Sequence, residues 1–388
     1  MNTEEKIPVA QTIAVMCVFS LTMTLGSITP VMAKIYEAYS NIPTAIVTYV
    51  SSIASIVSIL SSMFVGMLAG KKLGFKPTIF VLVVIFIAGG CVPAFIQGFP
   101  ALLISRGVFG LAMGGLSVLG NPLVTVYYPE NKRAGILGNS VFAAFGGAMI
   151  LQYAGAFLAD IQWYYAFLTH ALAVIPLILI LVFLPKTETA QDASFVKQKL
   201  FVPPKAVSVS IVFAAAWLFV TPLLFMSSVL AGTISKSSVT AATVTMFYSL
   251  GSLAGGLIFG KLYALAKNKC IGISLLLVAA GMFGAAISGN IALLCACMLI
   301  AGVGYCTALP AIMMIIGIVT LKPSVAFATA LLMVFMNVAS FLESGWIGLI
   351  EHITGDPVYM PIFVGAALMV LLGVSQFLIN PFPRNIER

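Results

Sequence analysis

The chain has 388 residues, of which 61% are hydrophobic and only 8% are charged. A soluble domain is about one quarter charged, so this composition excludes a water-exposed enzyme, a secreted module and a disordered chain. The net charge of +8 does not indicate nucleic-acid binding, because the basic residues lie in short clusters between long apolar runs rather than on one face of a soluble domain. The composition predicts an integral membrane protein.

Charge-free apolar runs predict the membrane spans, because a helix needs about 20 apolar residues to cross the hydrocarbon layer. The run 270–321 is too long for one crossing, and Ser288-Gly289-Asn290 supplies a turn within it. We therefore expect an all-α membrane protein with 12 transmembrane helices. The predicted spans are 10–33, 43–69, 77–96, 101–126, 134–158, 163–184, 206–231, 239–264, 270–288, 290–319, 324–349 and 359–379.

The positions of the basic residues predict the orientation. If the N-terminus is cytoplasmic, 16 of the 19 Lys and Arg residues lie on the cytoplasmic side, Lys34 and Lys236 lie outside, and Arg106 lies within a span. Basic residues are enriched in cytoplasmic loops, so we expect both termini in the cytoplasm. Residues 1–6 lack the basic character of a signal peptide, and the first span is expected to be retained.

The two halves of the chain show a weak internal repeat. Shifting the sequence by 194 residues, half its length, aligns Gly66 with Gly260 and Gly110 with Gly304, and a basic loop follows both members of the first pair. Two repeats that run in the same direction are one of the architectures of secondary transporters.

The longest polar stretch separates the two repeats. It covers residues 185–205 and carries Lys186, Glu188 and Asp192 among other charges. We therefore predict a six-helix bundle over residues 1–184, a cytoplasmic linker over 185–205, and a second six-helix bundle over 206–388.

The loop after the second span contains a family motif. It has the sequence Gly66-Met67-Leu68-Ala69-Gly70-Lys71-Lys72-Leu73-Gly74-Phe75-Lys76, which resembles the major facilitator superfamily motif Gly-x-Leu-Ala-Asp-Arg-x-Gly-Arg-Lys. Gly70 stands in place of the acidic residue, and one extra residue precedes Gly74. The resemblance implies a gating loop formed by Gly66, Leu68, Lys71, Lys72, Gly74 and Lys76, with Gly260 at the matching position in the second half.

A second motif of this superfamily is partly present in the fourth span, where Arg106-Gly107-Val108-Phe109-Gly110 resembles Arg-x-x-Gln-Gly. The fifth span has no proline, and so it lacks the motif of the drug antiporters. The resemblance implies the major facilitator fold, with two pseudo-symmetric six-helix bundles, and secondary transport by alternating access. It also implies that Arg106 forms hydrogen bonds with the first span.

Charged residues inside the predicted spans are candidates for coupling, because an ionisable group at membrane depth is costly and asks for a reason. Glu343 is the one carboxylate placed clearly within a span, and a buried carboxyl can exchange a proton near neutral pH. The alternative is a packing or capping role for Glu343. Arg106 is the second coupling candidate, and the alternative for it is direct contact with an anionic substrate. His170 is interpreted as an interfacial packing residue.

The resemblance also implies a central cavity lined by spans 1, 4, 7 and 10, to which spans 5, 8 and 11 add residues. The expected lining is mostly apolar and aromatic, which favours an amphipathic organic solute. Packing within the bundles is the alternative role for each aromatic residue and methionine. The cavity candidates are Met23, Ser27, Phe109, Met113, Gln152, Trp217, Thr221, Tyr248, Tyr305 and Asn337.

Several functions are excluded or kept as alternatives. The sequence has no nucleotide-binding glycine loop, no metal motif and no catalytic constellation, so we expect neither an enzyme nor a cofactor or metal. We predict a monomeric secondary transporter in the plasma membrane that moves a small organic solute, with proton coupling left open. The alternatives are an uptake carrier or exchanger that binds a small organic anion through Arg106, and, more distantly, a membrane sensor or lipid flippase.

Overall fold

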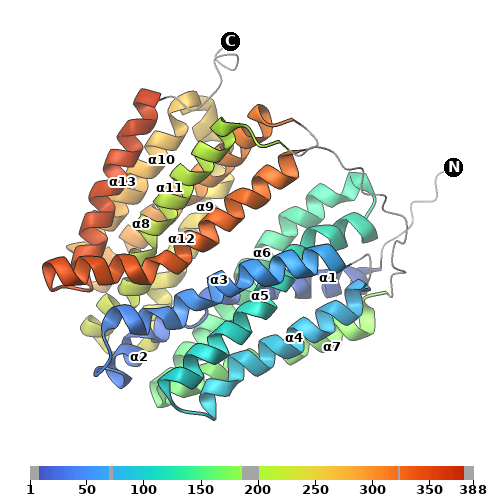
Figure 1. The fold of residues 1–388 in the computed structure, drawn as a ribbon, viewed down its shortest axis with the longest axis horizontal. Helices are drawn as coiled ribbons and strands as arrows, with labels where there is room; N and C mark the ends of the chain where they lie inside the picture. The colour runs from blue at the N-terminus through green and yellow to red at the C-terminus, as the bar shows by residue number, and fades with distance from the viewer. Residues whose placement is uncertain (1–7, 70–72, 186–200, 322–323, 380–388) are drawn as a thin grey trace. The chain divides into compact units, whose positions relative to one another are not determined.

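The structure is a computed structural model that describes residues 8–69, 73–185, 201–321 and 324–379. Every named element in these residues is helical (Figure 1). The α-helices of the first half are α1 Val9–Thr22, α2 Met32–Ala38, α3 Thr44–Leu68, α4 Phe75–Cys91, α5 Phe99–Tyr127, α6 Glu130–Ile161 and α7 Val174–Phe183. Those of the second half are α8 Pro204–Ser235, α9 Ser238–Ala266, α10 Cys270–Ala286, α11 Ile291–Val319, α12 Val325–Thr354 and α13 Tyr359–Ile379.

Five 3₁₀ segments interrupt or extend these helices. Four of them are a single turn long, whereas η4 runs for 11 residues at the start of the sixth span and was not predicted. The segments are η1 Thr24–Gly26, η2 Thr29–Val31, η3 Val92–Ala94, η4 Trp163–Ala173 and η5 Lys267–Lys269.

Ten helical segments among the described residues are long and apolar enough to cross a membrane, and the bent pair Val9–Thr22 and Thr24–Ala38 raises the number to eleven. One of the ten, Ser238–Ala286, comprises α9, η5 and α10. Its 49 residues would reach about 74 Å as one straight helix, which is more than twice the hydrocarbon thickness of about 30 Å.

The helices α9 and α10 run in opposite directions. A Cβ atom added at Gly251 would meet Leu299 and one at Gly255 would meet Val303, so α9 and α11 are parallel. The helices α10 and α11 follow each other after a short turn and pack side by side (Figure 1), so they are antiparallel. The segment Ser238–Ala286 therefore contains two crossings, which brings the described part of the chain to the 12 predicted spans.

The described residues form two compact units. Among them, unit 1 comprises residues 8–28, 49–69 and 73–185, and unit 2 comprises 29–48, 201–321 and 324–379. The grouping of Thr29–Thr48 with the second half differs from the simple division expected from the sequence. Most of the predicted linker, residues 186–200, lies outside the described residues.

The same helix–helix joint occurs in both units. A Cβ atom at Gly114 of α5 would collide with the backbone of Ser58 on α3, and one at Gly302 of α11 would collide with the backbone at Tyr248 and Ser252 on α9. Glycine permits such close approach of helices in a membrane, where apolar burial does not drive their association. The 194-residue shift places Ser58 on Ser252 but Gly114 on Ala308 rather than on Gly302, so the repeat is seen in the pairing of α3 with α5 and of α9 with α11, and not in the position of each glycine.

Local sequence signals explain where several helices begin and end. The Oδ1 atom of Asn290 accepts a hydrogen bond of 2.8 Å from the backbone N–H of Leu293 and so caps the start of α11. Gly355 adopts a φ of 76° where α12 ends, a conformation that glycine takes without strain. The observed helices agree with the predicted spans to within five residues at each end, apart from the interruption in the first span.

Candidate functional site

The first span is broken near its middle. We call α1 to α2, Val9–Ala38, span 1; its two parts, Val9–Thr22 and Thr24–Ala38, are bent by 50° at Met23, just before η1. Gly26 lowers helix stability, and Pro30 has no N–H to donate to the carbonyl oxygen of Gly26 four residues earlier. The sequence therefore frees backbone carbonyl groups at this point, and inside a membrane they need another donor.

Three side chains from other helices contact three consecutive residues at this break. Arg106 on α5 donates from Nη2 to the carbonyl oxygen of Leu25 at 3.1 Å, and Gln152 on α6 donates from Nε2 to that of Gly26 at 3.3 Å. The hydroxyl of Ser27 lies 3.2 Å from Nε2 of His170 in η4. Leu25-Gly26-Ser27 is thus held by α5, α6 and η4, and we call this segment the break of span 1.

Arg106 also holds a second helix. Its Nε atom donates to the carbonyl oxygen of Val50 on α3 at 3.1 Å, and its guanidinium lies 4.3 Å from the centre of the Phe109 ring. The side chain is 0% exposed, and Nη1 has no hydrogen-bond partner among the described residues. The hydrogen bond from Arg106 to span 1 is the contact that the family resemblance implies. Two of the three guanidinium nitrogens thus donate to backbone carbonyl oxygens.

His170 is buried inside unit 1. Its ring is fully buried, with the rings of Phe109 and Phe86 at centroid distances of 5.0 and 5.5 Å. Gly90 on α4 lies so close that an added Cβ atom would collide with the His170 ring. His170 therefore belongs to the polar contacts of the break, which the sequence analysis did not foresee.

An aromatic cluster in unit 2 gathers three of the predicted cavity residues. The ring of Tyr305 lies 4.9 Å from that of Trp217 and 6.5 Å from that of Tyr248. The indole N–H of Trp217 donates to the hydroxyl of Ser340 on α12. The Oη atoms of Tyr248 and Tyr305 are buried and have no hydrogen-bond partner among the described residues.

Glu343 on α12 is buried in the same unit. It is 1% exposed, and its Oε1 atom has no hydrogen-bond partner among the residues that the structure describes. Tyr36, on the segment that joins unit 2 from the first half, lies within electrostatic range of Glu343 and Glu351. The hydroxyl groups of Tyr36 and Thr48 are 2.9 Å apart. Sequence reasoning identified Glu343 but not Tyr36, which had no distinguishing pattern.

The other predicted cavity residues have varied surroundings. Met23 is 55% exposed at the break, and the sulfur of Met113 accepts a hydrogen bond of 3.2 Å from Thr24. Phe109, expected to line a cavity, is instead fully buried beneath Arg106. Thr221 is buried and bonded within α8, and Asn337 donates to the backbone of its own helix.

The predicted gating loop is only partly described. Lys71 and Lys72 lie outside the described residues, and Leu68 is the last residue of α3. A Cβ atom at Gly66 or Gly260 would meet no atom within 4 Å, so no other helix approaches these two glycines closely in the described part of this structure. Gly74 precedes α4, and Lys76 donates from Nζ to the carbonyl oxygen of Leu184 at 2.8 Å.

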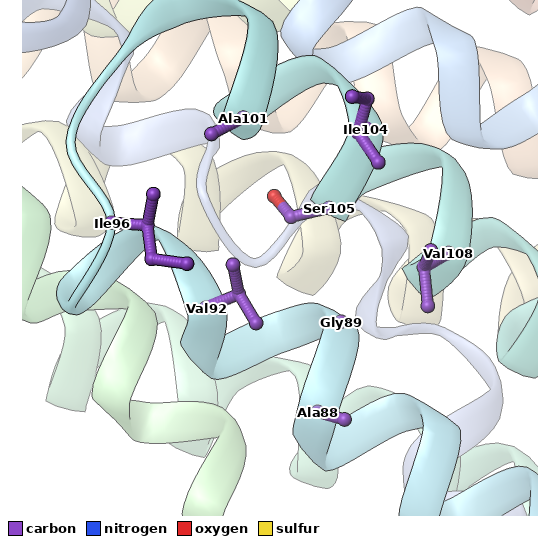
Figure 2. A pocket seen from close by; sticks show the side chains of 8 residues that line it. All are labelled: Ala88, Gly89, Val92, Ile96, Ala101, Ile104, Ser105 and Val108. Atoms are coloured by element: carbon purple, nitrogen blue, oxygen red, sulfur yellow. The ribbon is translucent and has the colours of Figure 1, made fainter.

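An apolar groove lies elsewhere in unit 1, between the end of α4 with η3 and the start of α5 (Figure 2). Its volume is about 280 Å³. Ser105 supplies the only side-chain polar atom of the lining, and its hydroxyl donates to the carbonyl oxygen of Leu102. The groove offers nothing that would orient a polar solute. The lining residues are Ala88, Gly89, Val92, Ile96, Ala101, Ile104, Ser105 and Val108.

Solved structures show the fold. The chain matches a bacterial homologue of the human lysosomal transporter Spinster, in an inward-facing and occupied conformation, with a TM-score of 0.74 and 15% identity over 95% of this chain and 96% of that one. It matches a D-xylose–proton symporter with a TM-score of 0.74 and 16% identity, over the same shares. The inward-open xylose transporter of E. coli gives a TM-score of 0.71 and 14% identity, over 95% of this chain and 94% of that one.

Sequence comparison identifies the family. The chain is 31% identical over 105 residues to a hexuronate transporter of Bacillus subtilis (strain 168), and this match spans 27% of the chain and only 25% of that relative. The family model of the Major Facilitator Superfamily matches residues 13–235, more than half of the chain. This multi-pass membrane protein, whose neighbours in fold are transporters rather than enzymes, belongs to the Major Facilitator Superfamily.

Proposed function

We propose that the chain is a proton-coupled secondary transporter in which Glu343 binds and releases the coupled proton. The main support is the burial of its carboxyl group, whose Oε1 atom has no partner among the described residues. A carboxylate in this environment would lose its hydration without compensation, so the neutral acid suits the state described here. Access to water in another state of the cycle would allow the proton to leave.

The aromatic cluster supports a small organic solute as the substrate. Trp217, Tyr248 and Tyr305 offer apolar ring faces, and the two phenol groups, which have no partner in the part of the chain that the structure describes, offer hydrogen-bond donors. Sites for organic solutes typically combine such a lining with a few polar groups that fix the orientation. An amphipathic solute with two hydrogen-bond acceptors would satisfy the two hydroxyl groups.

A second candidate function is the transport of a small organic anion. Two observations favour it: Nη1 of Arg106 is unpaired among the described residues, and a relative is named as a hexuronate transporter. Against it, Arg106 is fully buried and already donates to two backbone carbonyl oxygens. We therefore rank Arg106 first as a residue that holds the break of span 1, and second as an anion ligand.

The deciding experiment uses the purified protein in proteoliposomes. A thermal-shift screen that includes hexuronates and D-xylose identifies a ligand, and its uptake is then measured with and without an imposed pH gradient. We expect Glu343→Gln to abolish gradient-driven accumulation but to preserve binding and solute exchange, because exchange returns the loaded carrier without releasing the proton. Glu351→Gln, two turns further along α12, is the matched control and should accumulate the solute normally.

Each outcome of this experiment is informative. Undiminished uphill transport in Glu343→Gln would contradict coupling at Glu343. Absence of any solute uptake by the wild-type protein would favour the sensor or lipid flippase alternatives. Arg106→Ala distinguishes the two substrate classes: selective loss of binding for solutes with a carboxylate would support the anion transporter, whereas equal loss for neutral solutes would support a positioning role.

The cellular setting is part of this proposal. We place the protein as a monomer in the plasma membrane, and the 16-to-2 distribution of basic residues supports an orientation with both termini in the cytoplasm. A cysteine introduced at Ser194, in the predicted linker, should be shielded from an impermeant thiol reagent added to intact cells. Gly66→Val and Gly260→Val should impair transport if these helix ends approach other helices in another state of the cycle.

A further inference from the structure

The break of span 1 lies where the chain passes from one unit to the other. Unit 1 ends at Ile28 and resumes at Tyr49, and the residues between them group with unit 2. Leu25-Gly26-Ser27 are thus among the last residues of unit 1 before this passage. The contacts at the break therefore determine where span 1 leaves unit 1.

Hydrogen-bond chemistry fixes the form of His170. Its Nδ1 atom lies 2.9 Å from the carbonyl oxygen of Phe167, and a carbonyl oxygen can only accept, so Nδ1 carries the proton. The ring is 0% exposed, and burial disfavours a charged imidazolium. In the neutral ring Nε2 has a free lone pair, and the Ser27 hydroxyl, 3.2 Å away, is its donor.

The packing around His170 keeps that lone pair aimed at Ser27. The rings of Phe86 and Phe109 lie against the imidazole, and Gly90 contacts it so closely that no side chain fits between them. A ring confined on these sides and bonded at Nδ1 cannot turn to another donor. Ser27 therefore meets an acceptor in a fixed position.

The Ser27 contact differs from the other two contacts at the break. Arg106 and Gln152 donate to backbone carbonyl oxygens, and loss of either bond leaves a peptide group unsatisfied in the membrane interior. The Ser27–His170 bond joins two side chains, so it can open without exposing the backbone. It is the contact best suited to form and break during a conformational cycle.

We propose that His170 is a positioning residue for transport, whose Nε2 lone pair holds Ser27 and so fixes the point at which span 1 leaves unit 1. Release of this bond frees the outer part of span 1 to change its direction at the break. The inference rests on the geometry of the break and requires neither Glu343 nor a particular substrate.

Hydrogen–deuterium exchange on the purified full-length protein tests this inference without a known substrate. Ser27→Ala should accelerate exchange of the amides of residues 22–28 about tenfold and leave exchange in α8 unchanged. Ser27→Thr keeps the hydroxyl and should restore slow exchange. Thr22→Val is the matched control, because the Thr22 hydroxyl donates to the backbone of its own helix at Phe19 and not to another element.

A double-mutant cycle assigns the effect to the bond itself. His170→Phe keeps an aromatic ring but removes the acceptor, and its effect on exchange should not add to that of Ser27→Ala. A second readout is the accessibility of residue 23, measured with Met23→Cys in a background without other cysteines. The ratio of its labelling rates by an impermeant maleimide in inside-out and right-side-out vesicles should differ about fivefold from the wild-type ratio, both in Ser27→Ala and in His170→Phe.

Wild-type exchange in Ser27→Ala, additive effects in the double variant, or unchanged labelling of Met23→Cys would each overturn the proposal. A uniform fall in stability, with faster exchange in α8 as well as at the break, would also overturn it, since it would indicate a purely structural role. If His170→Phe does not fold, His170→Leu, which also lacks an acceptor, replaces it in the cycle, and His170→Gln, which retains an acceptor, should behave like the wild type. None of these results depends on proton coupling at Glu343.

Discussion

Span 1 and α8 are the first crossings of the two halves, and both contain a proline, yet only span 1 is broken. Pro30 removes the donor to the carbonyl oxygen of Gly26, and Gln152 of another helix replaces it. Pro222 removes the donor to the carbonyl oxygen of Leu218, and the hydroxyl of the adjacent Thr221 replaces it at 2.9 Å. The helix α8 continues through this point, from Pro204 to Ser235.

The difference shows that the source of the replacement donor decides what a proline does to a membrane helix. Where the donor lies on the same helix, the replacement hydrogen bond is independent of other helices, and the helix stays continuous. Where the donor lies on another helix, the shape of the span depends on its neighbours. Span 1 therefore has the properties of a hinge, and α8 those of a continuous helix.

The largest effect is expected where α6 touches the backbone of span 1. A Cβ atom at Gly147 would collide with the backbone of Ser20 near the end of α1, whereas one at the adjacent Gly146 would meet nothing within 4 Å. Gly147→Val should lower the free energy of unfolding by about 4 kcal/mol, because the backbone itself must move. Gly146→Val is the control and should unfold like the wild type in a thermal denaturation in detergent. Equal stability of the two variants would contradict this contact.

Removal of Arg106 should have the next largest effect, because it removes a donor from the carbonyl oxygen of Leu25 and another from that of Val50. Arg106→Leu should destabilise unit 1 by about 2 kcal/mol, since the buried carbonyl oxygen of Leu25 loses its donor at a cost of about 1–3 kcal/mol, whereas that of Val50 keeps its bond within α3. Arg106→Lys should be intermediate, because one ammonium group does not reach both Leu25 and Val50. If Lys restored full stability, two separate donors would not be needed.

Because span 1 depends on a hydrogen-bond donor from another helix, Gln152, a second substitution within span 1 should suppress the loss of that donor. Gln152→Leu should destabilise the protein by about 1.5 kcal/mol, because the carbonyl oxygen of Gly26 loses its donor. Pro30→Ala restores a backbone N–H to that carbonyl, so the double variant should regain the lost stability and exchange slowly at the break. Pro222→Ala cannot suppress Gln152→Leu and serves as the control. Failure of Pro30→Ala to rescue would indicate that Pro30 does not cause the break.

The fold was largely predictable because charge and apolar length determine membrane spans directly. Arg106 and Glu343 were also identifiable, since an ionisable residue in an apolar run is conspicuous. The break in span 1 had a signal as well: Gly26 and Pro30 lie four residues apart in a run rich in threonine and serine. That signal predicts a weakened helix, but length and hydropathy alone gave a single helix over 10–33.

The partners at the break were not predictable, because they are backbone carbonyl oxygens or distant side chains. No pattern in the sequence connects Gln152 to Gly26 or His170 to Ser27, which are more than 100 residues apart. The contact of Tyr36 with the unit that contains Glu343 depends on how Thr29–Thr48 packs, which a repeat of 194 residues does not reveal. Tertiary packing alone determines these neighbours.

The smallest effect is expected in α8, and it is the sharpest test of the comparison. Thr221→Val keeps the shape of the side chain but removes the hydroxyl that donates to the carbonyl oxygen of Leu218. Hydrogen bonds of this kind contribute about 0.6 kcal/mol inside a membrane, so the variant should be only slightly less stable. Thr221→Ser keeps the donor and should match the wild type. If the hydrogen bond from Thr221 to Leu218 keeps α8 continuous, the rate of hydrogen–deuterium exchange in Thr221→Val should increase near residues 218–222. The rate at the break of span 1 should stay unchanged. Faster exchange at both sites would mean that the two crossings are coupled, and that continuity of α8 does not arise from Thr221 alone.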